Sequence, residues 1–111
     1  MPFYLQYIEG FLRKLNWDIE EDQFQDSTPY GVKTFTNIIA TFEPEVKNKL
    51  VLACHYDSKN ISTSSGRFFI GATDSAVPCA IMLDIAKKLD CSLRQKRDKR
   101  KRVCRGIQFL I

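Results

Sequence analysis

Three polar side chains near the middle of the chain have the residue types and the spacing of a metal site. His55 and Asp57 directly follow the apolar segment 50–54, and Asp74 lies further on, in the turn "GATDS" ahead of a second apolar segment. Imidazole and carboxylate groups bind zinc, and a carboxylate also orients an imidazole that binds it. The residues indicate a metal site in which His55 and Asp57 are either two ligands or a ligand and the group orienting it.

Each of these residues also has an ordinary structural interpretation. An Asp or Ser at the start of a helix is a common N-cap, so Asp74 or Ser75 could cap the segment that follows. A catalytic zinc takes three protein ligands, whereas the chain has one histidine. Residue types alone do not distinguish a metal site from a strand and a helix that carry polar residues at their ends.

Two helices and four strands are predicted to position these side chains. The apolar patterns predict helices over 3–15 and 76–89, a short edge strand within "WDIEEDQF" at 17–24, and strands over 32–42, 50–55 and 103–111. We expect the first strands to pair antiparallel, and strands 50–55 and 103–111 to be parallel because helix 76–89 connects them. The apolar segment 50–55 is expected to be buried on both faces. The second helix is expected to have an apolar stripe of Val77, Ile81, Ile85 and Leu89, widened by Ala80, Leu83 and Ala86.

The fold class that follows is α/β, with a mixed, mainly parallel sheet flanked by helices. Ligands bind at the carboxyl ends of the parallel strands in such sheets, which is where His55 and Asp57 fall. The chain stops inside an apolar strand that ends at Ile111, and a sheet of this kind needs further elements to cover both faces. The sequence therefore predicts a truncated chain.

The composition is that of a single soluble globular domain, with 111 residues, 44% of them hydrophobic and 27% charged. We find no apolar run of about 20 residues that would span a membrane, and no targeting signal at the start. The net charge of +4 is concentrated in the basic run 94–105, "RQKRDKRKRVCR". We interpret the run as a solvated connecting loop, the alternative being a surface for nucleic acid or heparin. No aromatic residue lies among these charges to stack on bases, so no nucleic-acid partner is expected.

The four cysteines, Cys54, Cys79, Cys91 and Cys104, include no CxxC pair, which argues against a structural zinc finger or ribbon. Taken alone, they are most simply buried small apolar side chains. Asn60-Ile61-Ser62 is an N-glycosylation sequon, which matters if the protein enters the secretory pathway.

Three segments resemble the glutaminyl-peptide cyclotransferases, or glutaminyl cyclases. They are "TPYG" at 28–31, "LVLACHYDSK" at 50–59 and "GATDSAVPCAIMLDIAKKLD" at 71–90. These enzymes have the α/β/α sandwich fold of zinc exopeptidases, and the resemblance implies that residues 1–111 are the N-terminal portion of one such catalytic domain. Pro78 and Cys79 are typical of cyclases, whereas zinc aminopeptidases usually have G-A-x-D-x-x-x-G here.

The resemblance implies a role for each residue of the site. Asp74 matches a zinc ligand, and the enzymes hold one zinc ion, so His55, Asp57 and Ser75 are expected to support the site without binding the metal. Cys54 and Cys79 match a disulfide of secreted animal cyclases, which implies secretion or residence in the lumen of the endoplasmic reticulum or Golgi. Whether Cys91 and Cys104 pair is left open.

The reaction of the resembled family is conversion of an N-terminal glutamine (or glutamate) of a peptide to pyroglutamate. The α-amine attacks the side-chain amide carbon and ammonia leaves, zinc acting as Lewis acid and a glutamate transferring the proton. That glutamate and two further zinc ligands lie beyond the position that matches Ile111, so residues 1–111 alone are expected to be inactive and to bind zinc weakly. A zinc aminopeptidase and a non-catalytic truncated or spliced product are the alternatives, and the parent protein is expected to be monomeric.

Overall fold

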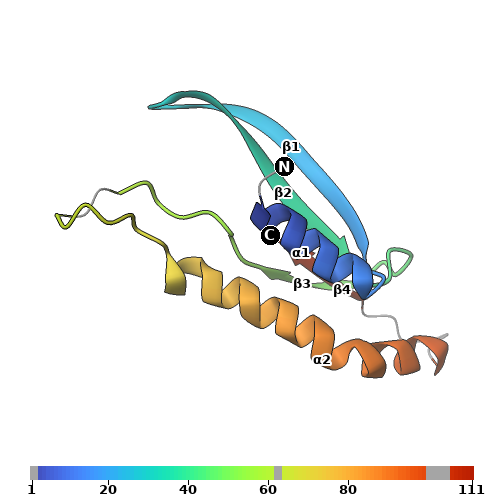
Figure 1. Ribbon diagram of the computed structural model, residues 1–111. Helices are drawn as coiled ribbons and strands as arrows, with labels where there is room; N and C mark the ends of the chain where they lie inside the picture. Colours follow the sequence, from blue (N-terminus) through green and yellow to red (C-terminus); the bar gives the residue numbers. More distant parts are fainter. Residues whose placement is uncertain (1–2, 62–63, 100–105) are drawn as a thin grey trace.

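The computed structural model describes residues 3–61, 64–99 and 106–111, with the side chains of 95–99 left aside (Figure 1). Both predicted helices and all four predicted strands are present. In chain order the elements are α1 (Phe3–Lys14), β1 (Asp18–Thr28), β2 (Gly31–Thr41), β3 (Lys49–Ala53), η1 (Ala72–Ala76), α2 (Val77–Lys99) and β4 (Gly106–Leu110). Here η1 is the irregular turn that leads into α2.

The strands form one mixed sheet in the order β1-β2-β4-β3. β1 pairs with β2 and β2 with β4 antiparallel, while β3 and β4 are parallel, so the predicted parallel pair is confirmed. Within the described residues, antiparallel pairings outnumber the parallel one, which differs from the mainly parallel sheet predicted. Both antiparallel pairings involve β2, which pairs with β1 and with β4.

The β1–β2 hairpin is an arm that extends well beyond the rest of the sheet. Its register runs from Asp18 opposite Thr41 to Thr28 opposite Gly31, whereas only Ile39–Thr41 pair with β4 (Figure 1). The short edge strand expected within 17–24 is therefore longer than predicted and runs over eleven residues, Asp18–Thr28. Its "DIEEDQFQDST" sequence is rich in acidic residues and mostly exposed, so hydrophobic alternation does not reveal its full length.

Both helices pack on one face of the sheet, where they form the core. On this face Ile38 and Phe109 have fully buried side chains and belong to one hydrophobic core with Leu12 of α1, and the ring of Trp17 lies 4.6 Å from that of Phe109, tilted by 36°. The opposite face, which carries Val51 and Leu110, has no helical layer among the described residues. The two-sided covering of the predicted sandwich is thus formed on one side only in this part of the molecule.

The face of α2 that enters the core matches the predicted stripe only in part. Val77, Ile81 and Leu89 are between 41% and 53% exposed, whereas Leu83 and Ala86, which were expected to widen the stripe, are buried as predicted. Cys79 and Met82 are buried with them, and the four residues have the i, i+3, i+4, i+7 spacing of one helix face. The helix has two apolar stripes, and the stripe with Cys79 packs on the sheet.

Two further predictions about α2 and β3 are corrected. The basic run 94–105 is not a loop throughout, because α2 continues to Lys99; residues 100–105 lie outside the described residues. Lys, Arg and Gln favour helices and the run contains no Gly or Pro to end one. β3 is the outer strand of this sheet, which leaves Leu50 and Val51 at least half exposed rather than buried. Among the described helices, none combines the length and apolarity needed to cross a membrane.

Candidate metal centre at the end of strand β3

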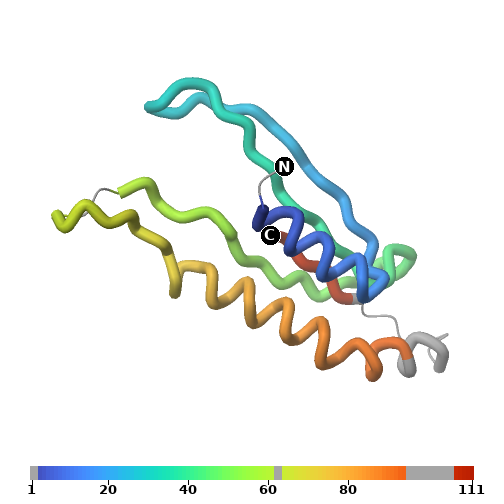
Figure 2. Tube along the Cα trace, in the orientation of Figure 1, coloured from blue at the N-terminus to red at the C-terminus, as the bar shows by residue number. Residues whose placement is uncertain are grey.

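The turn η1 places Asp74 beside the segment that follows β3. It begins after Gly71, whose φ of 61° is in the left-handed region. A side chain at this buried position would bring Cβ to 2.8 Å from the Asp74 carbonyl oxygen and 3.1 Å from Cβ of Ser58. Glycine is therefore required twice, by its conformation and by the close approach of the two segments. In Figure 2 these segments converge where the yellow η1 meets the start of α2.

His55 lies between two carboxylates that come from different parts of the chain. Its Nε2 is 2.6 Å from Asp74 Oδ1, and its Nδ1 is 3.1 Å from Asp57 Oδ1 and 2.9 Å from the Asp57 carbonyl oxygen. β3 ends at Ala53, so Asp57 reaches His55 through an irregular segment. The structure thus brings together His55, Asp57 and Asp74.

The hydrogen-bond partners of His55 favour its protonated form. Carboxylate and carbonyl oxygens accept hydrogen bonds, and an imidazole donates from both ring nitrogens only as the imidazolium. The hydrogen bond with Asp74 raises the pKa of His55 above 6.5, with a smaller contribution from the Asp57 backbone.

Two connections fix the end of β3 to η1 and α2. The buried Ser75 hydroxyl accepts a hydrogen bond from His55 N at 2.8 Å and donates one to His55 O at 2.7 Å. It bonds to the backbone of His55, which is a different role from the helix cap considered above. The predicted Cys54–Cys79 disulfide is present, with a Cα–Cα distance of 5.5 Å. Together they set the position of Asp74 relative to His55.

Tyr56, which the sequence analysis did not select, holds the same segment against the hairpin and α1. Its hydroxyl donates a hydrogen bond to the Thr36 carbonyl oxygen of β2 at 2.5 Å, and its ring lies 5.2 Å from that of Tyr4. Burial raises the pKa of Tyr56, so the hydroxyl stays protonated and keeps donating. The sequence signal that could have identified Tyr56 is an aromatic residue between two polar ones, His55 and Asp57.

An open cleft of about 390 Å³ adjoins this segment. His55 and Asp57 line it together with residues of the hairpin and the end of β4, including Ile111, but Asp74 does not. The cleft therefore reaches the groups that hold Asp74 and not the Asp74 carboxylate itself.

The donor set fits zinc in part. The Asp74 side chain is 83% exposed and uses Oδ1 to contact His55, so a carboxylate is available as a zinc ligand. Both nitrogens of His55 are engaged, which suits a residue that orients the ligand. The described residues contain no group of three His, Cys, Asp or Glu side chains that could enclose a metal ion. One exposed carboxylate that could serve as a ligand, that of Asp74, is present here, and His55 lies in contact with it.

Two remaining residues of interest lie away from this centre. Asn60 is exposed in the loop after Asp57, and the third residue of its sequon, Ser62, lies outside the described residues. Cys91 is exposed and unpaired in this part of the chain. Cys104 also lies outside the described residues, so their pairing is not tested.

The fold and this centre define the class of protein. Residues 37–111 match Peptidase family M28, a span that includes β3, the irregular segment, η1 and α2, and the chain belongs to this family. Within it the similarity is to glutaminyl cyclases, as the motifs indicated. The chain is 54% identical over 91 residues to a glutaminyl-peptide cyclotransferase of Gloydius blomhoffii and 55% identical over 90 residues to that of Bos taurus.

These similarities cover most of this chain and a small part of the relatives. Each alignment covers 79% of this chain and 25% of the relative, so the chain spans about a quarter of the length of the proteins it matches. A solved structure of Macrostomum lignano glutaminyl cyclase superimposes with a TM-score of 0.80 at 39% identity, over 96% of this chain and 29% of that one. Porphyromonas gingivalis glutaminyl cyclase, at 21% identity and a TM-score of 0.74, shares the fold.

Replacing Ser75 tests the connection between η1 and the end of β3. We expect Ser75→Ala to lower the free energy of unfolding by about 1–3 kcal/mol, because the His55 N–H and carbonyl lose a buried partner. Thr73→Ala is the control, since Thr73 is exposed in the same turn and its replacement should cost less than about 0.5 kcal/mol. Urea unfolding of the purified chain measures both, and equal costs would contradict the role given to Ser75.

The pH dependence of His55 tests its pairing with Asp74. The folded-state pKa is raised above the unfolded value, so the interaction stabilises the chain fully below about pH 6.5 and is lost as pH rises through the raised pKa. In metal-free protein, Asp74→Asn should lower the pKa of His55, and Asp57→Asn should lower it less because the Asp57 backbone carbonyl remains. Titration of the His55 ring signals by NMR measures the shifts, and an unchanged pKa in Asp74→Asn would exclude the pairing.

Proposed function

We propose that the protein of which this chain is part converts N-terminal glutamine (or glutamate) of peptide substrates to pyroglutamate, with release of ammonia from glutamine. The observation that carries the proposal is the exposed Asp74 carboxylate, held by His55 at the end of β3 in a chain 54% identical to a glutaminyl-peptide cyclotransferase. Since the chain spans about a quarter of that relative, the remaining groups of the site come from the rest of the protein.

The residues of this chain have distinct tasks in the proposed site. Asp74 supplies one carboxylate ligand to a single zinc ion, which when bound supplies Lewis-acid chemistry at the reacting amide. His55 holds one oxygen of that carboxylate by a hydrogen bond. Asp57 fixes the ring of His55 from the other side, and Ser75 fixes its backbone. None of these groups needs to move for substrate to bind, so the ligand is held in place in advance.

Residues 1–111 by themselves are proposed to lack cyclase activity and to bind zinc weakly. What supports this is the ligand count, because the described residues hold no cluster of three candidate ligands and a catalytic zinc takes three. A zinc aminopeptidase of the same family is the alternative for the whole protein, and it predicts release of a free N-terminal amino acid instead of a cyclised peptide. A non-catalytic product is the alternative for this chain.

The Asp74 carboxylate is tested in the full-length protein. We expect Asp74→Asn to lower zinc content and to reduce turnover of a peptide with N-terminal Gln by at least about 100-fold, since loss of even the outer partners of metal ligands costs 10–100-fold. Asp84→Asn is the matched control, because Asp84 pairs with Lys88 on the surface of α2, and it should retain both zinc and activity. Metal analysis and ammonia release are measured on the same samples, with residues 1–111 as a third sample.

Each outcome of this experiment is informative. Full zinc content and turnover in Asp74→Asn would exclude Asp74 as a ligand. Release of free glutamine without a cyclised product would favour the aminopeptidase. Stoichiometric zinc with turnover in residues 1–111 would overturn the proposal that the chain alone is inactive.

We also propose that the protein matures in an oxidising compartment, as a secreted protein or in the lumen of the endoplasmic reticulum or Golgi. The Cys54–Cys79 disulfide supports this, because such bonds persist mainly there. In protein produced through a secretory pathway, we expect Asn60 to carry a glycan that Asn60→Gln removes. Non-reducing peptide mapping by mass spectrometry checks both modifications, and free thiols at Cys54 and Cys79 would contradict the assignment.

A further inference from the structure

A buried carboxyl group lies at the contact between α1 and the hairpin. Glu9 is among the buried residues of α1, and its side chain is only 8% exposed. Its Oε1 atom has no hydrogen-bond partner among the described residues, and its Oε2 atom is 3.6 Å from a nitrogen of Arg13, an ion pair longer than an ordinary hydrogen bond. An ionised carboxylate with an unpartnered buried oxygen is costly, so this position favours a carboxyl group that can take up a proton.

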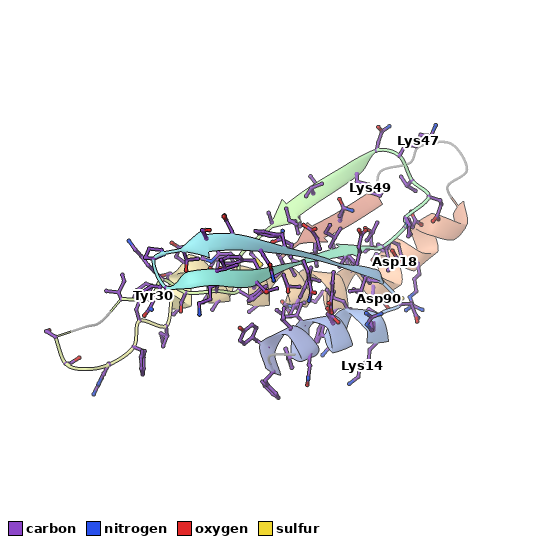
Figure 3. The ribbon with its side chains drawn as sticks, turned by 90° about the horizontal axis from the view of Figure 1, so that it is seen from above. Lys14, Asp18, Tyr30, Lys47, Lys49 and Asp90 are labelled. Carbon is purple, nitrogen blue, oxygen red and sulfur yellow. A yellow bond between two sulfur atoms is a disulfide. The ribbon has the colours of Figure 1, made fainter. Side chains whose placement is uncertain are left out.

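A second carboxyl group, that of Glu21 on β1, faces the same contact. Glu21 pairs with Ile38 across the hairpin, so both side chains are on the face of the sheet that packs against α1. α1 ends and β1 begins at the same end of the molecule, where Figure 3 shows Lys14 and Asp18. Glu9 is five helical residues (about 8 Å) back from this end and Glu21 three strand residues (about 10 Å), which brings the two carboxyl groups to nearly the same level.

A single proton held between the two carboxyl groups satisfies this arrangement. Carboxylates only accept hydrogen bonds, so a bond between the two requires that one of them be protonated. The pKa of Glu9 is raised above 4.5, first by burial and then by the hydrogen bond with Glu21 and its charge, whereas Arg13 lowers it. Burial and the second carboxyl group outweigh the guanidinium because the ion pair is long and the Arg13 side chain is 58% exposed to water.

α2, which also packs against α1, places its charged groups on other sides of that helix. Two of them line a cleft with Tyr7 and Phe11, each of which is two positions from Glu9 and so about 200° around the helix axis. Two more lie at the turn that follows α1. These residues are Asp84 and Lys87 at the cleft, and Arg94 with its partner Asp90 at the turn. The charges that act on Glu9 are those of Glu21 and Arg13.

We propose that Glu9 and Glu21 share a proton, and that loss of this proton weakens the attachment of α1 to the sheet as pH rises. Without the proton, two like charges face each other across the contact between α1 and β1 and repel. The effect extends toward the segment after β3, because the ring of Tyr4 on α1 lies 5.2 Å from that of Tyr56. The pKa of Tyr56 is raised mainly by burial and in part by Glu21, which places Tyr56 near the pair.

The pH dependence of stability in the full chain tests the proposal, with no metal or substrate needed. The folded-state pKa of Glu9 is raised above its unfolded value, so the shared proton stabilises the chain fully below about pH 4.5 and is lost as pH rises through the raised pKa. Glu9→Gln has no such proton to lose. The unfolding equilibrium constant of the unaltered chain, relative to that of Glu9→Gln, should therefore increase with pH, tenfold for each unit by which the pKa is raised. Urea unfolding followed by the fluorescence of the buried Trp17 measures it.

A second variant keeps the test independent of packing at position 9. Glu21→Gln removes the neighbouring charge and should lower the pKa of Glu9, which NMR titration of the side-chain carboxyl carbons measures. Glu20→Gln is the matched control, because Glu20 pairs with Ile39 on the opposite face of β1, and it should leave the titration of Glu9 and the pH dependence of stability unchanged.

Three results would each overturn the proposal. The first is a ratio of unfolding constants that stays the same between pH 4.5 and neutral pH. The second is an unchanged titration of Glu9 in Glu21→Gln. The third is an equal effect of Glu20→Gln and Glu21→Gln, which would assign the change to the net charge of β1 and not to the contact with α1.

Discussion

The connection between the end of β3 and the start of α2 is the constraint on which the site depends. Ser75 bonds to both backbone polar groups of His55, and the adjacent Cys54 is joined to Cys79. The disulfide closes a loop with a sequence separation of 25 residues, for which chain-entropy models give about 3–4 kcal/mol. Without this connection, residues 56–70 would be a long segment joining two elements. With it, Asp74 and His55 are held in contact across that segment.

The same connection explains which face of α2 is buried. A helix with two apolar stripes can rotate about its axis at little cost if burial alone decides, because either stripe removes similar apolar area from water. Cys79 must face Cys54, and this fixes the rotation of the helix. Met82, Leu83 and Ala86 share the face of Cys79 and so enter the core, whereas Ile81 does not. A covalent bond at the first turn thus determines the packing of the turns that follow.

The packing of the strands and of α2 also shows where prediction from the sequence succeeded and where it failed. The order of elements and the parallel pairing of β3 with β4 followed from local apolar patterns, which record burial along each element. The buried face of α2 followed only in part, because the choice between its two apolar stripes depends on a contact between residues distant in sequence. β1 was underestimated because a strand in an exposed arm has no buried face, so its residues alternate in direction without alternating in polarity.

The candidate site, too, could be predicted from the sequence only in part. His55, Asp57 and Asp74 could be selected from their residue types, but the irregular segment that lets His55 reach both carboxylates could not be derived from strand alternation. The roles of Ser75 and Tyr56 needed the structure, because both act on backbone groups that carry no sequence signal. The disulfide pairing came from resemblance, since four cysteines without a CxxC spacing do not define their partners.

Groups of opposite charge lie at the two ends of α2. The amino end of a helix carries a partial positive charge and the carboxyl end a partial negative one. Asp74 precedes the amino end of α2, where a carboxylate is stabilised even before His55 is counted. Arg94, which pairs with Asp90, falls toward the other end, where a cation stabilises a helix; α2 continues to Lys99. An acidic group at the start and a basic run at the finish therefore both favour the helix. The position of each is consistent with the polarity of the backbone, and the residues that carry chemistry do not conflict with the fold.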